Sequence, residues 1–325
     1  MSYRHGSARR RQWSVQKLRL VFAGTPAAAV PSLERLAASG HEIVAVVTRP
    51  AAPLGRKRLL TPSPVAQAAE RLGLPIVEAA RLDAEATARI AASEPDLGVI
   101  VAYGGLVREP LLSTPPHGWI NLHFSLLPAW RGAAPVQHAL IAGEAETGAA
   151  VFRLVPELDA GDVFADLRRT IVADDTAGAL LDELAMSGAE LLAGVVDGIA
   201  DGTAAAAPQV GEPSFAPKLG IDDARLNWSA SAATVLARYR GVTPEPGAWT
   251  TIEGQRLKLL ELAASSDSPP ETSLRPGELA ASGRRLFIGT ADAPIEVRRV
   301  QPAGRTGMAA ADWWRGSGRD GMVAE

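Results

Sequence analysis

The sequence predicts an α/β protein in which a doubly wound, Rossmann-like domain is followed by a small OB-like β-barrel domain. Over the first two thirds of the chain, short apolar runs alternate with amphipathic stretches, a pattern typical of a mostly parallel sheet covered by helices. After Asp222, short alternating strands are separated by turn residues, which favours a small barrel. The length of 325 residues also favours two domains.

The elements of the first domain follow from apolar runs, which predict strands, and from apolar residues at helical spacing, which predict helices. The expected strands are Leu18–Ala23, Ile43–Thr48, Pro75–Glu78, Leu97–Ala102 and a strand that ends at His123, and the expected helices are Pro26–Ser39, Ser63–Leu72, Ala84–Ser93 and Thr176–Ile199. In such a sheet ligands bind beyond the carboxyl ends of the strands. The turns after Ala23, Thr48, Ala102 and His123 are therefore where a site is expected.

The predicted domain boundaries are 1–17 for a basic extension, 18–203 for the first domain, 204–221 for a linker and 222–325 for the second domain. The extension is rich in arginine and lacks the apolar core of a secretory signal, so we expect it to be disordered. A mitochondrial transit peptide and an artefact of the start codon remain alternatives. The second domain is expected to contain a helix at Ser231–Arg240 and strands at Arg256–Leu262, Arg284–Ile288 and Ile295–Val300.

Composition excludes several classes of protein. The chain has no cysteine, so disulfides, thiolate metal ligands and cysteine nucleophiles are absent, which suits a reducing compartment. The longest apolar run, Leu97 to Val107, is far shorter than the roughly 20 residues that cross a bilayer. A net charge of −3 gives no general attraction to nucleic acid. We expect a cytoplasmic monomer that is not bound to a membrane.

Phosphate-binding and hydrolase motifs are missing as well. The turn after the first strand is F-A-G-T-P, with one glycine instead of the three of a dinucleotide-binding fingerprint. The chain has no Walker loop, and no serine has glycines two residues away on both sides. A nicotinamide enzyme, a P-loop enzyme and an α/β-hydrolase are therefore not expected.

The stretch I-N-L-H-F-S-L-L-P contains the first candidate site residues. Asn121 and His123 lie two residues apart on a predicted strand and so face the same side. The following turn at Leu126-Leu127-Pro128 leaves backbone groups open beside them, which could hold a flat heterocycle. Asp159 lies in a second turn, L-D-A-G-D.

An amide, an imidazole and a carboxylate together suit acyl transfer from one nitrogen to another. The tetrahedral oxyanion of that reaction needs a hydrogen-bond donor, and the proton needs an acid or base that titrates near neutrality. Each residue also has a structural alternative: His123 as a buried hydrogen-bonded histidine, Asn121 as an amide that satisfies the backbone, and Asp159 as a turn residue. Their joint occurrence favours the catalytic interpretation.

The motifs A-G-T-P, V-A-Y-G, N-L-H-F-S-L-L-P and L-D-A-G-D together resemble those of the folate-dependent formyltransferases, and the resemblance extends from Leu18 to about Trp314. It implies that Asn121 holds the developing oxyanion and that His123 supplies a positive or hydrogen-bonding edge to it. By the same resemblance, Asp159 orients His123 and helps to move protons. It also implies that the backbone of Ser125, Leu126, Leu127 and Pro128 holds the folate. The formyl donor would be 10-formyltetrahydrofolate, used as a co-substrate, and no metal is implied.

Within that family the motifs are most similar to those of members that act on methionyl-initiator tRNA in translation initiation. The resemblance makes Arg56, Lys57 and Arg58, in the loop from Pro50 to Pro62, candidates for tRNA phosphate contacts, with Lys218 a further one. The structural alternative is a solvated cluster of charges. Two functional alternatives also remain: a formyltransferase for a small amine, such as an amino-sugar nucleotide or glycinamide ribonucleotide, and a non-catalytic folate- or RNA-binding module.

Overall fold

The computed structural model describes residues 16–54, 58–265, 274–319 and 321–325. The chain divides into two compact units, one made of the residues up to Asn121 together with Ala189–Ala206, the other of Leu122–Gly188 together with Ala207–Glu325. The predicted domain boundaries at 203 and 222 remain sequence-based predictions. No helix in the described part of the chain is both long and apolar enough to cross a membrane.

The largest sheet is mixed. Its strands are β1 (Arg19–Gly24), β2 (Glu42–Thr48), β5 (Ile76–Glu78), β6 (Leu97–Val101), β7 (Trp119–His123), β9 (Glu146–Arg153) and β10 (Val163–Thr170), in the order β10-β9-β7-β6-β1-β2-β5. Strand β1 pairs in parallel with β2 and β6, and β2 pairs in parallel with β5, whereas β9 and β10 are antiparallel. The parallel core confirms the predicted α/β class.

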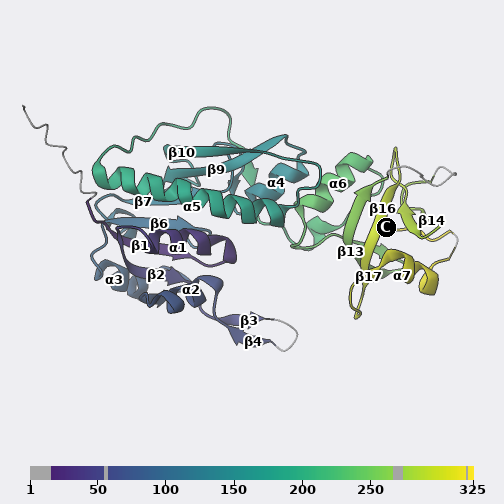
Figure 1. The fold of residues 1–325 in the computed structure, drawn as a ribbon, viewed down its shortest axis with the longest axis horizontal. Helices are drawn as coiled ribbons and strands as arrows, with labels where there is room; N and C mark the ends of the chain where they lie inside the picture. Colours follow the sequence, from purple (N-terminus) through teal and green to yellow (C-terminus); the bar gives the residue numbers. More distant parts are fainter. Residues whose placement is uncertain (1–15, 55–57, 266–273, 320) are drawn as a thin grey trace, which may run out of the picture. The chain divides into compact units, whose positions relative to one another are not determined.

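Three helices of the first unit follow its strands: α1 (Val30–Ala37), α2 (Pro64–Leu72) and α3 (Ala84–Ala91) (Figure 1). Two of them begin at side-chain caps, because Ser63 Oγ accepts from Ala66 N and Asp83 Oδ1 accepts from Ala86 N. The helix predicted at Pro26–Ser39 is shorter than expected, since a 3₁₀ turn, η1 (Ala27–Ala29), precedes α1. A second 3₁₀ turn, η2 (Leu111–Ser113), precedes β7.

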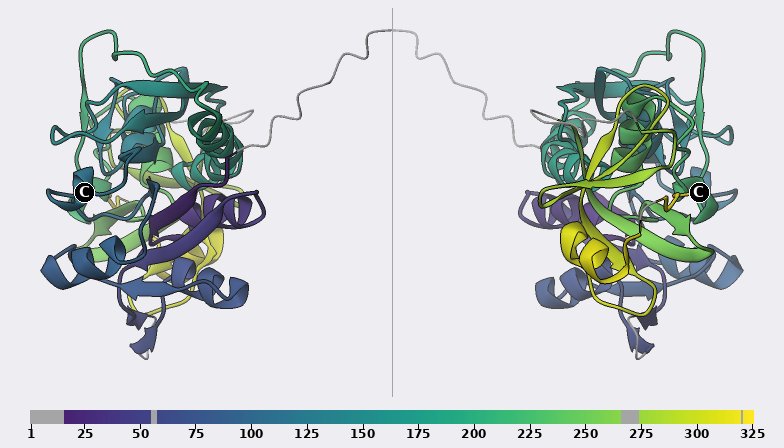
Figure 2. Two further views of the ribbon diagram at one scale, coloured as in Figure 1. Left: turned by 90° about the vertical axis from the view of Figure 1, so that its left-hand side faces the viewer. Right: turned by 90° about the vertical axis from the view of Figure 1, so that its right-hand side faces the viewer.

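A small hairpin extends from the first unit between β2 and α2 (Figure 2). It consists of β3 (Ala52–Leu54) and β4 (Leu59–Thr61), which pair antiparallel within the loop expected to contact tRNA. Leu54, Leu59 and Leu60 are 67%, 65% and 72% exposed. These three leucines leave an exposed apolar patch on the hairpin.

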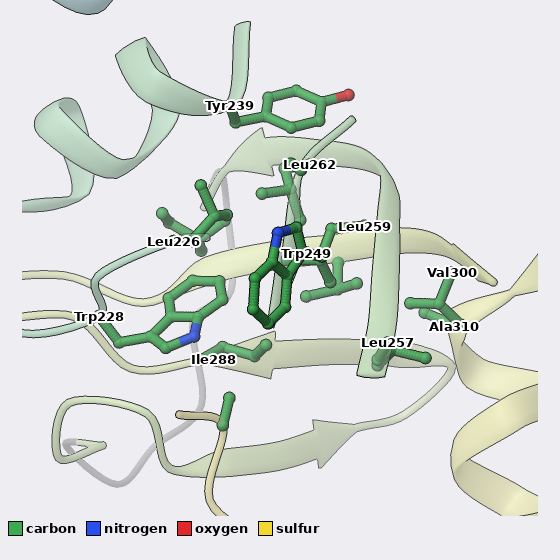
Figure 3. Packing of buried hydrophobic residues seen from close by; sticks show 14 of the residues in the cluster. Leu226, Trp228, Tyr239, Trp249, Leu257, Leu259, Leu262, Ile288, Val300 and Ala310 are labelled. Carbon is green, nitrogen blue, oxygen red and sulfur yellow. The ribbon is translucent and has the colours of Figure 1, made fainter. Parts of the chain in front are cut away.

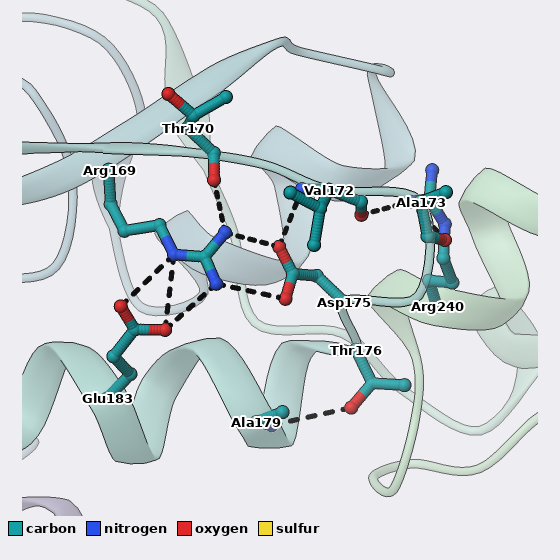
Figure 4. Close-up of polar contacts among 9 residues, drawn as sticks. All are labelled: Arg169, Thr170, Val172, Ala173, Asp175, Thr176, Ala179, Glu183 and Arg240. Atoms are coloured by element: carbon teal, nitrogen blue, oxygen red, sulfur yellow. Dashed lines mark hydrogen bonds and ion pairs between the residues drawn. The ribbon is translucent and has the colours of Figure 1, made fainter.

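The second unit contains a partly buried charge network at the end of β10. Arg169 forms ion pairs with Asp175 and with Glu183 of α5 (Ala177–Asp201), at 2.6 and 2.9 Å (Figure 4). Asp175 also accepts from the N–H of Val172. Arg240 of α6 (Ala232–Gly241) donates to the carbonyls of Val172 and Ala173. The connection from β10 to α5 is thus held by side chains on three elements.

Two short strands and one helix lie after the turn that follows β7 and in the segment after α5. Strand β8 (Arg131–Gly132) precedes α4 (Pro135–Ile141), and β11 (Phe215–Ala216) pairs with β8 in parallel. The segment predicted as a linker therefore contains a strand. Sequence periodicity could not show it, because a two-residue strand has no period.

The C-terminal part forms an antiparallel sheet in the order β12-β13-β16-β15-β14, with β17 on β16. Its elements are η3 (Asp222–Ala224), β12 (Trp249–Ile252), β13 (Gln255–Ala264), β14 (Leu279–Ser282), β15 (Arg285–Ile288), β16 (Ile295–Pro302), β17 (Met308–Ala309) and α7 (Ala310–Ser317). Residues 322–325 hydrogen-bond to Thr251 on one side and to Gly277 and Leu279 on the other. They join the two edges of the sheet, as a barrel requires.

One hydrophobic core fills this barrel. Trp228, Trp249, Leu257, Leu259 and Ile288 lie among its buried side chains (Figure 3). The indole N–H groups of the two tryptophans are satisfied, since Trp228 donates to Thr250 Oγ1 and Trp249 donates to the carbonyl of Ile221. The three strands predicted here are confirmed. β13 and β16 are longer than predicted, whereas β15 begins one residue later than predicted and ends at Ile288 as expected.

Candidate active site

Strand β7 contains both Asn121 and His123 at its carboxyl end. Because alternate residues of a strand face the same side, the two side chains project from one face of β7. The carboxamide oxygen of Asn121 is buried, and no group in the described residues forms a hydrogen bond to it. An unsatisfied buried polar atom is uncommon in a folded protein. The amide oxygen is therefore not used to satisfy the backbone, which was the structural alternative for this residue.

His123 is buried and is fixed at one ring nitrogen. Its Nε2 lies 2.9 Å from the carbonyl oxygen of Trp130. Because a carbonyl can only accept, Nε2 must carry the proton of this hydrogen bond. In the neutral ring the lone pair is then on Nδ1, which is 3.9 Å from Asp159 Oδ2. The edge of the ring also contacts Phe152 of β9, with ring centroids 6.3 Å apart.

Burial lowers the pKa of His123 below its usual 6.5, although the Asp159 carboxylate and the Trp130 carbonyl both act in the opposite direction. The imidazole is therefore neutral at pH 7, with Nδ1 able to accept a proton. Asp159 is the charged group that faces it and would stabilise the imidazolium that results. This arrangement suits a general base.

Asp159 has a structural role in addition to its position beside His123. It adopts φ = 46°, a left-handed conformation that is rare for residues other than glycine, and its Oδ2 accepts from Gly132 N at 2.8 Å. The 3.9 Å separation from His123 is too long for a direct hydrogen bond. The contact that fixes the His123 ring is the one to Trp130, so the influence of Asp159 on His123 is mainly electrostatic.

The turn after β7 is held by its own residues. Ser125 is fully buried, and its hydroxyl donates to the carbonyl of Ala129 at 2.6 Å. Ala129 N donates to the carbonyl of Leu126. Leu126 packs on Gly148 of β9, where a Cβ would come within 2.6 Å of the leucine side chain. The backbone of Ser125, Leu126, Leu127 and Pro128 is thus a rigid segment directly after the His123 strand.

The residues expected to contact tRNA are only partly described. Arg56 and Lys57 lie outside the described residues. Arg58 is exposed immediately before β4, in the first unit, and Lys218 is exposed two residues after β11, in the second unit. Among the described residues of the second unit, no hydrogen bond or ion pair joins Lys218 to His123 or Asp159.

Trp130 and Gly132 were not assigned individual roles from the sequence. Trp130 supplies the carbonyl for His123, and Gly132 supplies the N–H for Asp159. Both act through the backbone, which no pattern of side chains reveals. The only signal was their place in W-R-G-A-A-P, directly after the N-L-H-F-S-L-L-P motif. Among the described residues no group of three or more histidine or acidic side chains is arranged to hold a metal ion.

The fold and these residues define an enzyme of one-carbon acyl transfer. Residues 17–196 match the family described as Formyl transferase, and residues 218–318 match the family described as Formyl transferase, C-terminal domain. Together the matches cover most of the chain. The chain belongs to the formyltransferase family.

Curated relatives match nearly the whole length of the chain. The methionyl-tRNA formyltransferase of Leifsonia xyli subsp. xyli is 62% identical over 94% of this chain and 100% of its own length. The methionyl-tRNA formyltransferase of Acidothermus cellulolyticus is 50% identical over 92% of this chain and 97% of its own length.

A solved structure of a more distant protein shares the fold. The N-formyltransferase of Helicobacter canadensis, in complex with folinic acid and dTDP-3-aminofucose, matches with a TM-score of 0.65 at 16% identity. The match covers 88% of this chain and 99% of that one. At this identity the similarity concerns the fold alone.

Proposed function

We propose that the chain transfers a formyl group from 10-formyltetrahydrofolate to the α-amino group of methionine esterified to initiator tRNA, at a centre formed by Asn121, His123 and Asp159. The observation that carries the proposal is the full-length relationship to methionyl-tRNA formyltransferases, at 62% identity for the relative from Leifsonia xyli. The match covers 94% of this chain and 100% of that relative.

In the reaction, the methionyl amine attacks the formyl carbon, which forms a carbon–nitrogen bond and places negative charge on the formyl oxygen. The Nδ2 amide of Asn121 donates to that oxygen. The proton of the attacking amine passes to Nδ1 of His123, whose lone pair faces Asp159 across 3.9 Å. Collapse breaks the bond to folate nitrogen N10, which receives the proton, so that atoms and charge balance.

Folate would lie against the rigid backbone of Ser125, Leu126, Leu127 and Pro128. Support comes from the hydrogen bonds that fix this turn and from its place directly after His123. A preorganised backbone segment can hold the pterin by its amide edge without loss of conformational entropy on binding. No metal has a part in this proposal.

The acceptor end of the tRNA would contact the hairpin of β3 and β4. The exposed leucines of the hairpin support this proposal, as does the exposed cation Arg58 immediately before its second strand. Arg56 and Lys57, in the same loop, and Lys218 are proposed to contact phosphates as well. Such contacts would position the RNA and would not identify its sequence.

The test is transfer of labelled formyl from 10-formyltetrahydrofolate by the purified full chain. Methionyl-initiator tRNA, methionyl-elongator tRNA and an amino-sugar nucleotide serve as parallel acceptors. We expect the initiator species to be labelled fastest. Labelling confined to the small amine would overturn the acceptor, and no labelling of any acceptor would favour a binding protein.

The oxyanion role of Asn121 has its own test. Asn121→Ala should lower kcat by about 10² or more, because it removes a donor that acts mainly in the transition state. Circular dichroism and the unfolding midpoint should stay close to wild type, since the lost amide oxygen has no hydrogen-bond partner among the described residues. Turnover at the wild-type rate would contradict the role.

We also propose that the chain is a cytoplasmic monomer. Light scattering on the purified protein should give the mass of a single 325-residue chain.

A further inference from the structure

Two loops have an unusual backbone beside His123: the loop that contains Trp130 and Gly132, and the loop that contains Asp159. Trp130 and Asp159 adopt φ values of 62° and 46°, and Gly132 adopts 126°. Left-handed conformations are unfavourable for residues with a side chain and persist where the surroundings enforce them. The carbonyl of Trp130 and the carboxylate of Asp159, which both act on His123, therefore depend on whatever holds these loops.

Gln209, in the segment that leads to β11, contacts both loops. Its Nε2 donates to the carbonyl of Asp159 and to the carbonyl of Gly161, each at 2.8 Å. Its Oε1 accepts from Arg131 Nη2 at 2.6 Å and from Arg131 Nε at 3.2 Å. Arg131 lies between Trp130 and Gly132, so one amide joins the loop of Trp130 to the loop of Asp159.

The chemistry of Gln209 matches this position closely. A primary amide has two N–H donors and an oxygen with two lone pairs, and all four are used. A carboxylate of the same size could still accept from Arg131 but could not donate to the two carbonyls. Gly161 itself cannot be replaced easily, because a Cβ there would lie 1.8 Å from the carbonyl oxygen of Arg153.

The segment that contains Gln209 is anchored on both sides. Ala207 exchanges two backbone hydrogen bonds with Val163, at the start of β10. Ser214 Oγ accepts from Trp130 N at 2.9 Å, and β11, which begins at the next residue, pairs in parallel with β8. Gln209 is therefore held at a defined distance from both loops, and its contacts are part of a supported backbone.

We propose that Gln209 is a positioning residue for formyl transfer, which acts by holding the backbone of Asp159 and Arg131 so that His123 keeps its two polar neighbours. The inference rests on the proposed function. It assigns to the segment between the predicted domains a role in the chemistry, in addition to its role as a connection.

The experiment compares Gln209→Glu and Gln209→Ala with the wild-type full chain. Gln209→Glu is isosteric and removes the two donated hydrogen bonds, so it tests them without creating a cavity. For both variants we expect kcat to fall about 10- to 100-fold, with KM for folate and tRNA changed less than about twofold, because misplacement affects the transition state more than binding. Val210→Ala is the control, since Val210 is the next residue and is 88% exposed.

A second readout does not depend on turnover. The pKa of His123, followed by NMR of the labelled imidazole, should fall in Gln209→Ala, because Asp159 favours the charged ring and would be displaced. Gln209→Glu is judged by kcat, since the negative charge that it adds beside the Asp159 loop would itself raise this pKa. A loss of stability alone would leave this pKa unchanged in the folded fraction. Val210→Ala should match wild type in kcat and in the His123 pKa.

Wild-type kcat in Gln209→Glu or an unchanged His123 pKa in Gln209→Ala would overturn the inference, as would a rise in KM at constant kcat in either variant. If Gln209→Ala does not fold, the kcat of Gln209→Glu decides alone. If the wild-type chain transfers no formyl group to any acceptor, the proposed function fails. The NMR titration then still decides whether Gln209 positions Asp159 beside His123.

Discussion

At the scale of single residues, the candidate site differs from ordinary core and turn positions in ways that can be stated physically. Asn121 has a buried oxygen without a hydrogen-bond partner in the described residues, His123 is buried with one ring nitrogen occupied, and Asp159 has a left-handed backbone. Each feature costs stability. Asn121 and His123 lie at the end of one strand, and Asp159 lies in a turn beside His123. A functional site would bring three such costly features together.

The burial of His123 leads to a prediction on pH. Since burial holds its pKa below 6.5, and a general base must be neutral, the decline of log(kcat/KM) that belongs to His123 should have its midpoint below pH 6.5, once the titration of the methionyl α-amine has been corrected for. The measurement is kcat/KM between pH 5 and 8 under saturating folate. A decline with its midpoint at or above pH 6.5 would show that burial does not dominate at this site.

At the scale of elements, the C-terminal barrel depends on specific pairs across its strands. Arg285 of β15 forms a bidentate ion pair with Glu296 of β16, with both hydrogen bonds at 2.9 Å. Glu296 is only 8% exposed. The hydrogen bond from Arg285 is the main cause that holds the pKa of Glu296 below its usual 4.5, and Arg298 acts in the same direction.

Glu296→Gln should therefore lower the free energy of unfolding at pH 7 by about 1 to 3 kcal/mol, the range for a hydrogen bond to a charged group. The lowered pKa means that this stabilisation is complete above about pH 4.5 and is lost as the pH falls through the pKa of the folded state. The difference between variant and wild type should shrink towards pH 3. Urea unfolding at pH 7, 5.5, 4 and 3.5 measures it.

The matched control is Glu253→Gln, in the same barrel. Glu253 pairs with Arg319 at 2.8 Å, but both side chains are more than half exposed. Water and salt screen such pairs, so we expect a change below about 1 kcal/mol with little dependence on pH. Equal effects of the two substitutions would contradict the assigned importance of the buried pair.

At the scale of the whole molecule, charge limits how the chain can bind RNA. The net charge of −3 provides no general attraction, so any affinity must come from a few local cations. Each phosphate contact releases counterions and adds to the dependence of binding on salt. The number of contacts can therefore be measured without a structure of the complex.

We expect the double substitution Arg58→Gln and Lys218→Gln to reduce the slope of log K against log[salt] for tRNA binding by about 1.4 to 1.8. Arg35→Gln with Arg71→Gln is the control, because it removes the same charge from residues that already pair with Glu190 and Glu34. A reduction of equal size in the control would mean that overall charge, and not contact, sets the slope. Filter binding at four salt concentrations provides the data.

Sequence patterns alone predicted the fold class and most elements that have a clear period. Strands β1, β2 and β6 are continuous apolar runs, and α2 and α3 begin at Ser63 and Asp83, so local chemistry specifies them. Strands β9 and β10 were not predicted. β9 is E-T-G-A-A-V-F-R, with one glycine and two alanines at its centre, and β10 is a half-exposed edge strand with two arginines, so neither has a strong apolar period.

The candidate site residues themselves could be selected from the sequence, because Asn121, His123 and Asp159 are side chains whose chemistry is visible in one dimension. Only the tertiary structure revealed that the Trp130 carbonyl fixes His123, that the Gly132 N–H holds Asp159, and that Gln209 joins the two loops. These contacts are made largely by backbone groups, which every residue has, and they connect positions 7 to 50 residues apart. The sequence by itself determined which chemical groups are present; tertiary folding decided their distances, their burial and hence their protonation.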